Sequence, residues 1–299
     1  MKGRLLLSLA VACALGGLGV SYWALFARPE GRAEPARAIA PETLRLTAAS
    51  GVVEVAAADG KWRPVKVGAT LSEHDRIRTD AEGSAALLAA DGSTVRLSGG
   101  SEAEVAALRR ELKRLHLGAG MVEADVPADP TRVFQIDLDR AGGAARTRGA
   151  HFTATANSSG TAVAAVAAVR GEVILSARGK EVVIRAGQWA RILPGAPPET
   201  PGPIPDSLFL KVAWPATASR SHAVAVSGQT TAGARVRVGG RWVEVDRDGV
   251  YRAQLELADG VHQLAVHAVD VSGHTADEKG PKILVDTRTD FKIHPPKWK

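Results

Sequence analysis

The sequence predicts an all-β protein in which an N-terminal transmembrane helix carries two β-rich domains. Only 4% of the residues are aromatic, whereas valine, alanine, leucine and glycine are abundant, which favours cores of small aliphatic side chains packed between strands. Short apolar runs alternate with glycine and Asp-Gly turns along most of the chain, as in successive hairpins. The run from Leu5 to Ala27 has no charged residue, and about 20 such residues form a helix that crosses a bilayer.

Length and composition limit the kind of protein further. A chain of 299 residues suits about two domains, each with its own core. The net charge of +6 favours anionic partners, such as phospholipid surfaces or acidic envelope polymers, without selecting one. The only cysteine, Cys13, lies in the apolar run, which excludes disulfides, thiol chemistry and cysteine-ligated metals from the folded part.

The N-terminal region divides into three segments. Residues 1–4 form a cytoplasmic tail, 5–27 a transmembrane signal anchor and 28–43 a linker rich in arginine, alanine and proline. The apolar run is longer than the core of most cleaved signal peptides, and bulky Leu25 is unfavourable for cleavage, so we expect an anchor that is retained. Acylation of Cys13 is the weaker alternative, because apolar chain continues well beyond it. Positive charges are nearly balanced on the two sides of the run, so they do not fix the orientation.

The first domain is expected over residues 44–193. Valine-rich and alanine-rich runs precede the Asp59-Gly60 and Asp91-Gly92 turns, which predicts hairpins. One stretch differs, because leucines and valines recur at helical spacing over residues 105–115 among basic residues, so a short helix is possible there. These basic residues are read as a solvated face and not as a nucleic-acid site.

A proline-rich linker over residues 194–206 separates the domains, since its proline density favours extended polyproline II over ladder pairing. The second domain, over residues 207–288, shows clear alternation: Tyr251, Ala253 and Leu255 are apolar and the residues between them polar. About seven such runs predict an immunoglobulin-like β-sandwich. Residues 289–299 are expected to be a disordered basic tail.

The segment from Gly51 to Ile192 resembles the FecR domain of Gram-negative envelope proteins. Pieces similar to the family occur in its order, among them Ala90-Asp-Gly-Ser-Thr-Val95, Leu117-Gly-Ala-Gly-Met-Val122 and Val169-Arg-Gly-Glu-Val173. The Gly-Thr-x-Phe signature of the family is present as Gly149-Ala-His-Phe152, with alanine in place of threonine. The resemblance marks the following turn and core positions: Asp91, Gly92, Gly149, Phe152, Gly171 and Gly187.

The resemblance implies a location and a role. In the best-understood members, a periplasmic domain receives a signal from an outer-membrane transporter and passes it to a cytoplasmic sigma factor. Here we expect only residues 1–4 on the cytoplasmic side, too few to bind a sigma factor, so the resemblance implies an inner-membrane protein with both domains in the periplasm that interacts with an envelope protein. Residues 208–287 resemble bacterial immunoglobulin-like domains, which implies architecture more than any ligand.

No catalytic pattern is found in the sequence, and we expect neither an enzyme nor a cofactor. His262 and His267, five residues apart on one strand, would point to opposite faces, a poor arrangement for metal ligands. Asp-Gly turns explain the aspartates of the second domain better than calcium does, although calcium stays open. These aspartates are Asp246, Asp248, Asp259 and Asp270.

Two functions from different classes remain. The first is a periplasmic protein-interaction or signal-sensing module, whose partner is an unidentified envelope protein. The alternative is a cell-wall or polysaccharide-binding tether, which would need exposed aromatic platforms. The candidate platforms are Trp62, Trp189, Trp242 and Trp298.

Overall fold

A computed structural model describes residues 42–157 and 163–287, and every regular element in these ranges is a β-strand. The all-β prediction is thus confirmed for this part of the chain. None of its elements is a helix of the length and apolarity that membrane crossing requires. The predicted cytoplasmic tail at 1–4, the anchor at 5–27, the linker up to residue 41 and the tail at 289–299 lie outside the described residues.

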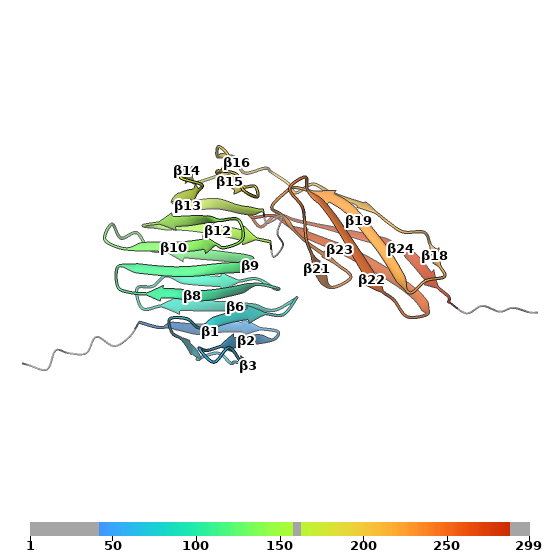
Figure 1. Ribbon diagram of the computed structural model, residues 1–299, viewed down its shortest axis with the longest axis horizontal. Helices are drawn as coiled ribbons and strands as arrows, with labels where there is room; N and C mark the ends of the chain where they lie inside the picture. Colours follow the sequence, from blue (N-terminus) through green and yellow to red (C-terminus); the bar gives the residue numbers. More distant parts are fainter. Residues whose placement is uncertain (1–41, 158–162, 288–299) are drawn as a thin grey trace, which may run out of the picture. The chain divides into compact units, whose positions relative to one another are not determined.

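The first lobe, residues 44–204, is a 16-stranded sheet folded into two layers (Figure 1). Neighbouring strands of the first layer follow the order β4-β1-β6-β7-β9-β12-β13-β15-β16. The bounds are β1 Leu44–Ser50, β4 Thr70–Leu71, β6 Ser84–Ala89, β7 Thr94–Leu97, β9 Leu112–Val126, β12 Ala150–Ala156, β13 Ala164–Ala177, β15 Gln188–Ile192 and β16 Gly202–Pro203.

The second layer follows the order β3-β2-β5-β8-β9-β10-β11-β13-β14. Its additional strands are β2 Val53–Ala56, β3 Trp62–Pro64, β5 Arg76–Thr79, β8 Glu102–Leu108, β10 Val133–Leu138, β11 Gly143–Thr147 and β14 Lys180–Arg185. All pairs are antiparallel except β9 with β10. One hydrophobic core, which extends from Leu44 to Ile192, fills the space between the layers.

Strands β9 and β13 belong to both layers, and glycines mark the points where they cross. Gly120 in β9 has a φ of +106°, and a Cβ there would lie 2.3 Å from Ser101 Oγ. Gly171 in β13 has a φ of +77°, a conformation that favours glycine. Because each long strand continues from one layer into the other, the two layers are joined by backbone as well as by side-chain packing.

The helix considered for residues 105–115 is wrong, because β8 and β9 form a hairpin there. Arg109 and Leu112 exchange backbone hydrogen bonds across the turn, and Val105 pairs with Leu115. A bulge between Val105 and Ala107 shifts the alternation by one residue. An inward-facing lysine, Lys113, then occupies a position where alternation predicts an apolar residue. The bulge and the inward-facing lysine together give the apolar residues of two strands the spacing of a helix.

The second lobe, residues 208–287, is a sandwich of a 3-stranded sheet, β17-β19-β22, and a 5-stranded sheet, β18-β24-β23-β20-β21. Its core includes Val226, Val236, Tyr251 and Ile283. The bounds are β17 Leu210–Ala213, β18 Ala218–Ser219, β19 Ala223–Thr230, β20 Arg235–Val238, β21 Arg241–Val243, β22 Val250–Glu256, β23 Gly260–Val269 and β24 Thr275–Val285.

The proline-rich segment pairs with the edge of the first lobe, contrary to the extended linker expected there. Gln188 pairs with Pro203 between β15 and β16, and Ile192 forms an isolated bridge with Pro198. Ile204 also donates its N–H to the Gly187 carbonyl at 3.0 Å. Proline is compatible with this position because an edge strand needs ladder hydrogen bonds on one side only.

Side chains of the second lobe also bond to the first. Trp242 Nε1 donates to the Ala81 carbonyl at 2.9 Å, and Arg235 Nη2 donates to the Gly100 carbonyl at 3.0 Å. The Arg235 guanidinium lies 4.0 Å from the centre of the Trp242 ring, and burial lowers the pKa of Arg235 to about 10. The Arg235 guanidinium therefore remains positively charged at neutral pH.

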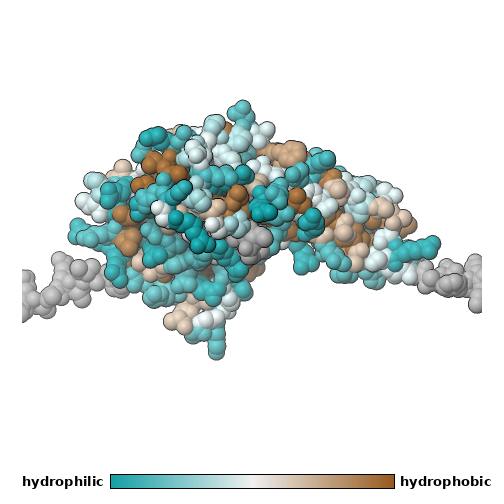
Figure 2. Space-filling model, turned by 45° about the horizontal axis from the view of Figure 1, so that its top comes forward, coloured by the Kyte–Doolittle hydropathy of each residue, from teal (hydrophilic) through white to brown (hydrophobic). Residues whose placement is uncertain are grey.

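The surface is mostly hydrophilic on the face shown in Figure 2, with small hydrophobic patches. The exposed large apolar side chains of the described residues are distributed over both lobes, so they do not mark one large patch. They are Val52, Val67, Leu88, Val169, Val183, Phe209, Val261 and Leu284.

Candidate functional site

Several motif positions from distant parts of the sequence meet around the loop between β9 and β10, residues 127–132. A Cβ on Gly149 would lie 2.5 Å from Ala128 Cα, and one on Gly92 would lie 3.6 Å from Pro127 Cγ. A Cβ on Gly171 would lie 2.4 Å from the Gly149 carbonyl oxygen. The absence of a side chain is therefore required at Gly149, which lies against the loop, and at Gly171 in β13, which lies against Gly149, whereas the Gly92 turn contacts the loop at an ordinary van der Waals distance.

Asp91, in the turn beside Gly92, takes part in a buried ion cluster. Lys113 is only 4% exposed, and its Nζ lies 2.7 Å from Asp91 Oδ2 and 3.1 Å from Glu42 Oε2. A buried ammonium without such partners would carry a desolvation cost of several kcal/mol. The cluster connects the beginning of β9 to the β6–β7 turn and to the residues before β1.

The same cluster continues into the loop. Arg132 Nη1 lies 3.7 Å from Asp91 Oδ2, and Arg132 Nε lies 2.9 Å from Asp129 Oδ2. Asp129 Oδ1 accepts hydrogen bonds from Thr131 N at 2.9 Å and from Thr131 Oγ1 at 2.7 Å. The conformation of the loop is thus fixed by its own aspartate and by Asp91.

Both aspartates are stabilised as carboxylates. Burial by itself raises the pKa of Asp91, but hydrogen bonds from Lys113 and Ser93 outweigh it, so its pKa lies below the usual value. Hydrogen bonds from Thr131 lower the pKa of Asp129. Neither carboxyl group has the raised pKa of a general acid at neutral pH, so the cluster organises the loop and carries no acid–base pair.

The other two motif positions lie elsewhere. Phe152 is fully buried in the core and packs edge-on against Phe134, with ring centroids 6.3 Å apart. Gly187 has a φ of +78° in the turn before β15, where its carbonyl accepts the Ile204 hydrogen bond. These residues support the fold and the docking of the proline-rich segment.

Two adjoining hollows flank the loop. A cavity of about 80 Å³ is lined by Asp91, Lys113, Arg132, Arg110 and Arg148, among others. A wider groove of about 870 Å³ extends over the outer face of β10, β11 and β13. Both are lined by Ala128, Asp129, Val133 and Arg148, so they adjoin, and we call the two together the loop groove.

Some cationic side chains of the loop groove have ion-pair partners and others do not. The side chains of Arg110 and Arg148 are exposed and have no ion-pair partner among residues 42–157 and 163–287, whereas Lys113 and Arg132 are paired. An unpaired guanidinium offers forked donors suited to a carboxylate or phosphate. The arrangement can therefore bind an anionic group. From the sequence, Arg110 is read as part of a solvated basic face and Arg148 is not singled out, because the two belong to different turns and only the fold brings them to one cavity.

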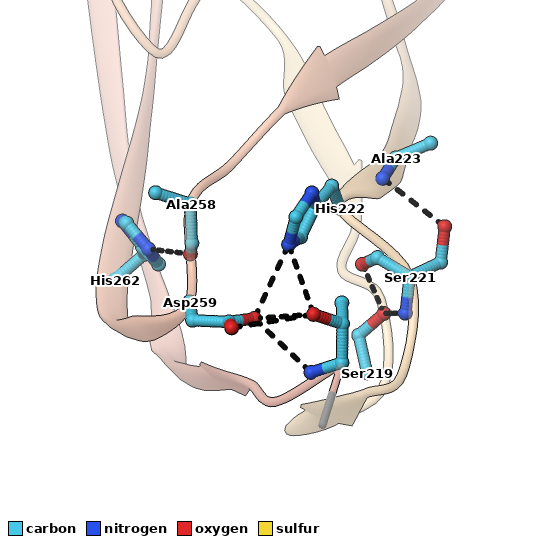
Figure 3. A network of polar contacts seen from close by, with 8 residues as sticks. Ser219, Ser221, His222, Ala223, Ala258, Asp259 and His262 are labelled. Atoms are coloured by element: carbon cyan, nitrogen blue, oxygen red, sulfur yellow. Dashed lines mark hydrogen bonds and ion pairs between the residues drawn. The ribbon is translucent and has the colours of Figure 1, made fainter. Parts of the chain in front are cut away.

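A second polar cluster, in the second lobe, contains a hydroxyl, an imidazole and a carboxylate (Figure 3). His222 Nε2 lies 3.2 Å from Thr287 Oγ1 and 3.2 Å from Asp259 Oδ1. A catalytic relay requires the two different ring nitrogens, one for the nucleophile and one for the carboxylate. Here one nitrogen contacts both, and Thr287 donates directly to Asp259 at 2.9 Å. The cluster fastens the end of β24 to the β22–β23 turn.

Of the other aspartates considered for calcium, Asp246 and Asp270 cap their own turns, and Asp248 lies 3.7 Å from Arg247. Asp246 Oδ1 accepts from the N–H groups of Asp248 and Val250, and Asp270 Oδ1 accepts from those of Ser272 and His274. Residues 42–157 and 163–287 contain no group of three or more histidine, cysteine and acidic side chains that could hold a metal ion.

The two histidines of β23 contact different groups. His262 contacts the Ala258 carbonyl at 2.7 Å, and His267 pairs with Asp277 at 2.8 Å. Their contacts do not converge on a shared ligand.

Three of the four tryptophans expected as binding platforms are described, and each of the three is half-buried and contacts other residues. Arg78 lies 4.3 Å from the centre of the Trp62 ring, and Trp189 packs against a small apolar cluster with Ala165 and Val271. Trp242 bonds to the first lobe, and Trp298 lies outside the described residues. The three described tryptophans do not form a row of exposed rings.

Comparison with known proteins identifies the segment that contains the loop groove. Residues 75–174 match the family described as FecR protein, which confirms the resemblance of the first lobe. A solved structure of a candidate anti-sigma factor from Parabacteroides distasonis is 14% identical over 43% of this chain and 59% of that chain, with a TM-score of 0.38. The chain thus spans less than two thirds of that protein. The fibronectin(III)-like modules of CbhA from Clostridium thermocellum are 12% identical over 65% of this chain and 100% of that chain, with a TM-score of 0.25. No curated protein matches the sequence.

Proposed function

This chain contains a FecR domain over residues 75–174, and from this we propose that it is a membrane-anchored periplasmic signalling protein. In this proposal the apolar run at residues 5–27 anchors the chain in the inner membrane, and both lobes receive or transmit a signal through contact with another envelope protein. The proposed role is not enzymatic and requires no cofactor.

The observation that carries the proposal is the position of the loop groove inside the matched segment. All residues that form its two hollows, from Asp91 to Ile174, fall within residues 75–174. The FecR family has a regulatory role, and the groove is a depression with unpaired cationic side chains, which suits recognition of another molecule.

The test is in-cell crosslinking of the full chain, followed by identification of the attached molecules. Recurrent attachment of one envelope protein would support the proposal. Recurrent peptidoglycan or polysaccharide, without a protein, would replace it with the glycan-tether alternative. The half-buried positions of Trp62, Trp189 and Trp242 argue against that alternative.

Orientation needs its own measurement. A reporter enzyme that is active only outside the cytoplasm, fused to the C-terminus of the full chain, is expected to be active. An inactive fusion, together with a fluorescent cytoplasmic reporter at the same position, would place both lobes inside and contradict the proposed location.

A further inference from the structure

From the charges and shape of the loop groove we infer that it binds an extended, acidic and apolar segment of a partner protein. The inference rests on the proposed function and names the part of the partner that is recognised. The segment would place a carboxylate in the small cavity, beside Arg110 and Arg148, and apolar side chains along the wider groove.

The small cavity selects for an anion. Arg110 and Arg148 line it without ion-pair partners among the described residues, while its carboxylates, Asp91 and Asp129, are already bound by Lys113, Ser93, Arg132 and Thr131. A carboxylate entering the cavity would therefore meet guanidinium donors that no internal acid neutralises. A volume of about 80 Å³ accommodates one such group with little else.

The wider groove selects for apolar side chains. Val133, Pro130 and Ile174 line it, and Ile174 pairs across the strands with Val183, which is 39% exposed on β14. Val133, Pro130 and Ile174 form the apolar floor of the groove, and an apolar side chain of the outermost strand of this layer lies beside it. An extended segment that crosses β10, β11, β13 and β14 would bury these side chains together.

These features favour a polypeptide over other anionic partners. A phosphate polymer would leave the apolar floor uncovered, and the half-buried tryptophans lie outside the lining of the groove. Glu172, at the side of the groove, is paired with Arg185 at 3.2 Å, and Arg146 is paired with Glu181 at 2.8 Å. The unpaired charge therefore concentrates at Arg110 and Arg148, where a single acidic residue would act as anchor.

Fluorescence anisotropy of the full chain tests this inference with two labelled ten-residue peptides. One alternates glutamate with valine, and the other has lysine in place of glutamate. The acidic peptide is expected to bind and the basic one not. The double variant R110Q/R148Q should weaken binding of the acidic peptide at least tenfold. The matched control R220Q/R241Q removes two exposed, unpaired arginines from the second lobe and should leave binding unchanged.

Three results would overturn the inference. The peptides could bind equally, or the control variant could weaken binding as much as R110Q/R148Q. Alternatively, phosphatidylglycerol vesicles could bind in an Arg110- and Arg148-dependent manner while the acidic peptide does not, which would assign the groove to a membrane surface.

A crosslinking experiment separates this inference from the proposed function. A photo-crosslinking residue is placed in the full chain either at Val133, in the groove, or at Val261, which is 65% exposed in the second lobe. Capture of one envelope protein from Val133 supports both proposals. Capture from Val261 alone keeps the function and refutes the groove. Capture of no protein from either position refutes the function.

Discussion

The two lobes join their β-sheets in different ways. In the first lobe, β9 and β13 pass from one layer to the other, and a lysine with two carboxylates is buried beside the crossing layers. In the second lobe, the 3-stranded and 5-stranded sheets share no strand, and the described cluster of His222, Asp259 and Thr287 is exposed. The contrast indicates that the buried ion cluster has a structural role inside the first lobe, whereas the exposed cluster of the second lobe is peripheral. The buried charge of the second lobe, Arg235, bonds instead to the first lobe.

The largest loss of stability is expected when the buried ammonium of Lys113 is removed. Lys113→Ala removes the ammonium shared by Asp91 and Glu42 and leaves Asp91 with only the more distant Arg132, and breaking a buried ion pair from one side costs about 3–5 kcal/mol. Urea unfolding of the full chain measures the loss, and hydrogen exchange should locate it in β9 and β10. Arg247→Ala, in the second lobe, breaks an exposed pair 3.7 Å from Asp248 and should cost about 0–1 kcal/mol. Equal losses would remove the distinction between the lobes.

A glycine substitution tests the close approach of β13 to Gly149. Gly171→Ala requires a non-glycine residue at φ +77°, which costs about 1–2 kcal/mol, and places a Cβ 2.4 Å from the Gly149 carbonyl oxygen. Since backbone cannot move aside, we expect a loss above that range. Gly240→Ala, at φ +85° with no atom within 4 Å, should show the strain alone. Urea midpoints of the two variants give the comparison; a Gly171→Ala chain no less stable than Gly240→Ala would contradict the close approach.

The bonds between the lobes can be tested at a tryptophan. Trp242→Phe keeps an aromatic ring beside Arg235 but removes the donor to the Ala81 carbonyl, at a cost of about 1–3 kcal/mol. Differential scanning calorimetry should show the second lobe unfolding earlier and apart from the first. Trp62→Phe, which loses no described side-chain hydrogen bond, serves as the control. An unchanged thermogram for Trp242→Phe would show that this bond does not couple the lobes.

The pH dependence of the first lobe has a defined sign. The pKa of Asp91 is lower in the folded state than its unfolded value of about 3.9, so its contribution is present above that pH and is lost as pH falls through the folded pKa. Each pKa unit of lowering corresponds to about 1.4 kcal/mol. Urea unfolding between pH 7 and pH 3 should show this loss, with a shallower slope for Asp91→Asn. Parallel slopes would exclude Asp91 as its source.

Much of the fold could be predicted because local patterns specify it. Asp59-Gly60 and Asp91-Gly92 indicated turns, and the alternation through Tyr251 and Leu255 indicated strands with one buried face. The helix at 105–115 was wrong because the burial of Lys113 depends on Asp91 and Glu42, which are distant in the sequence.

The candidate site could be predicted only in part. The resemblance marked Asp91, Gly92, Gly149 and Gly171, and the structure brings the first three to the loop and places Gly171 against Gly149. Arg110 and Arg148 carry no local signal, since an exposed arginine in a turn is common in any sequence. Only strand pairing, which joins β9 to β10 and β10 to β11, places both on the same cavity.

The smallest effect is expected at the exposed cluster of the second lobe. Hydrogen bonds from Thr287 lower the pKa of Asp259, yet both partners are open to solvent, so water replaces much of what a substitution removes. Asp259→Asn should leave the urea midpoint nearly unchanged and accelerate exchange of the Thr287 amide, which bonds to Asp259 Oδ1 at 3.0 Å. His222→Gln, which changes the other partner, provides the matched variant. If Asp259→Asn destabilised the chain as much as Lys113→Ala, burial would not be what separates the two clusters, and charge in the second lobe would need a structural role of its own.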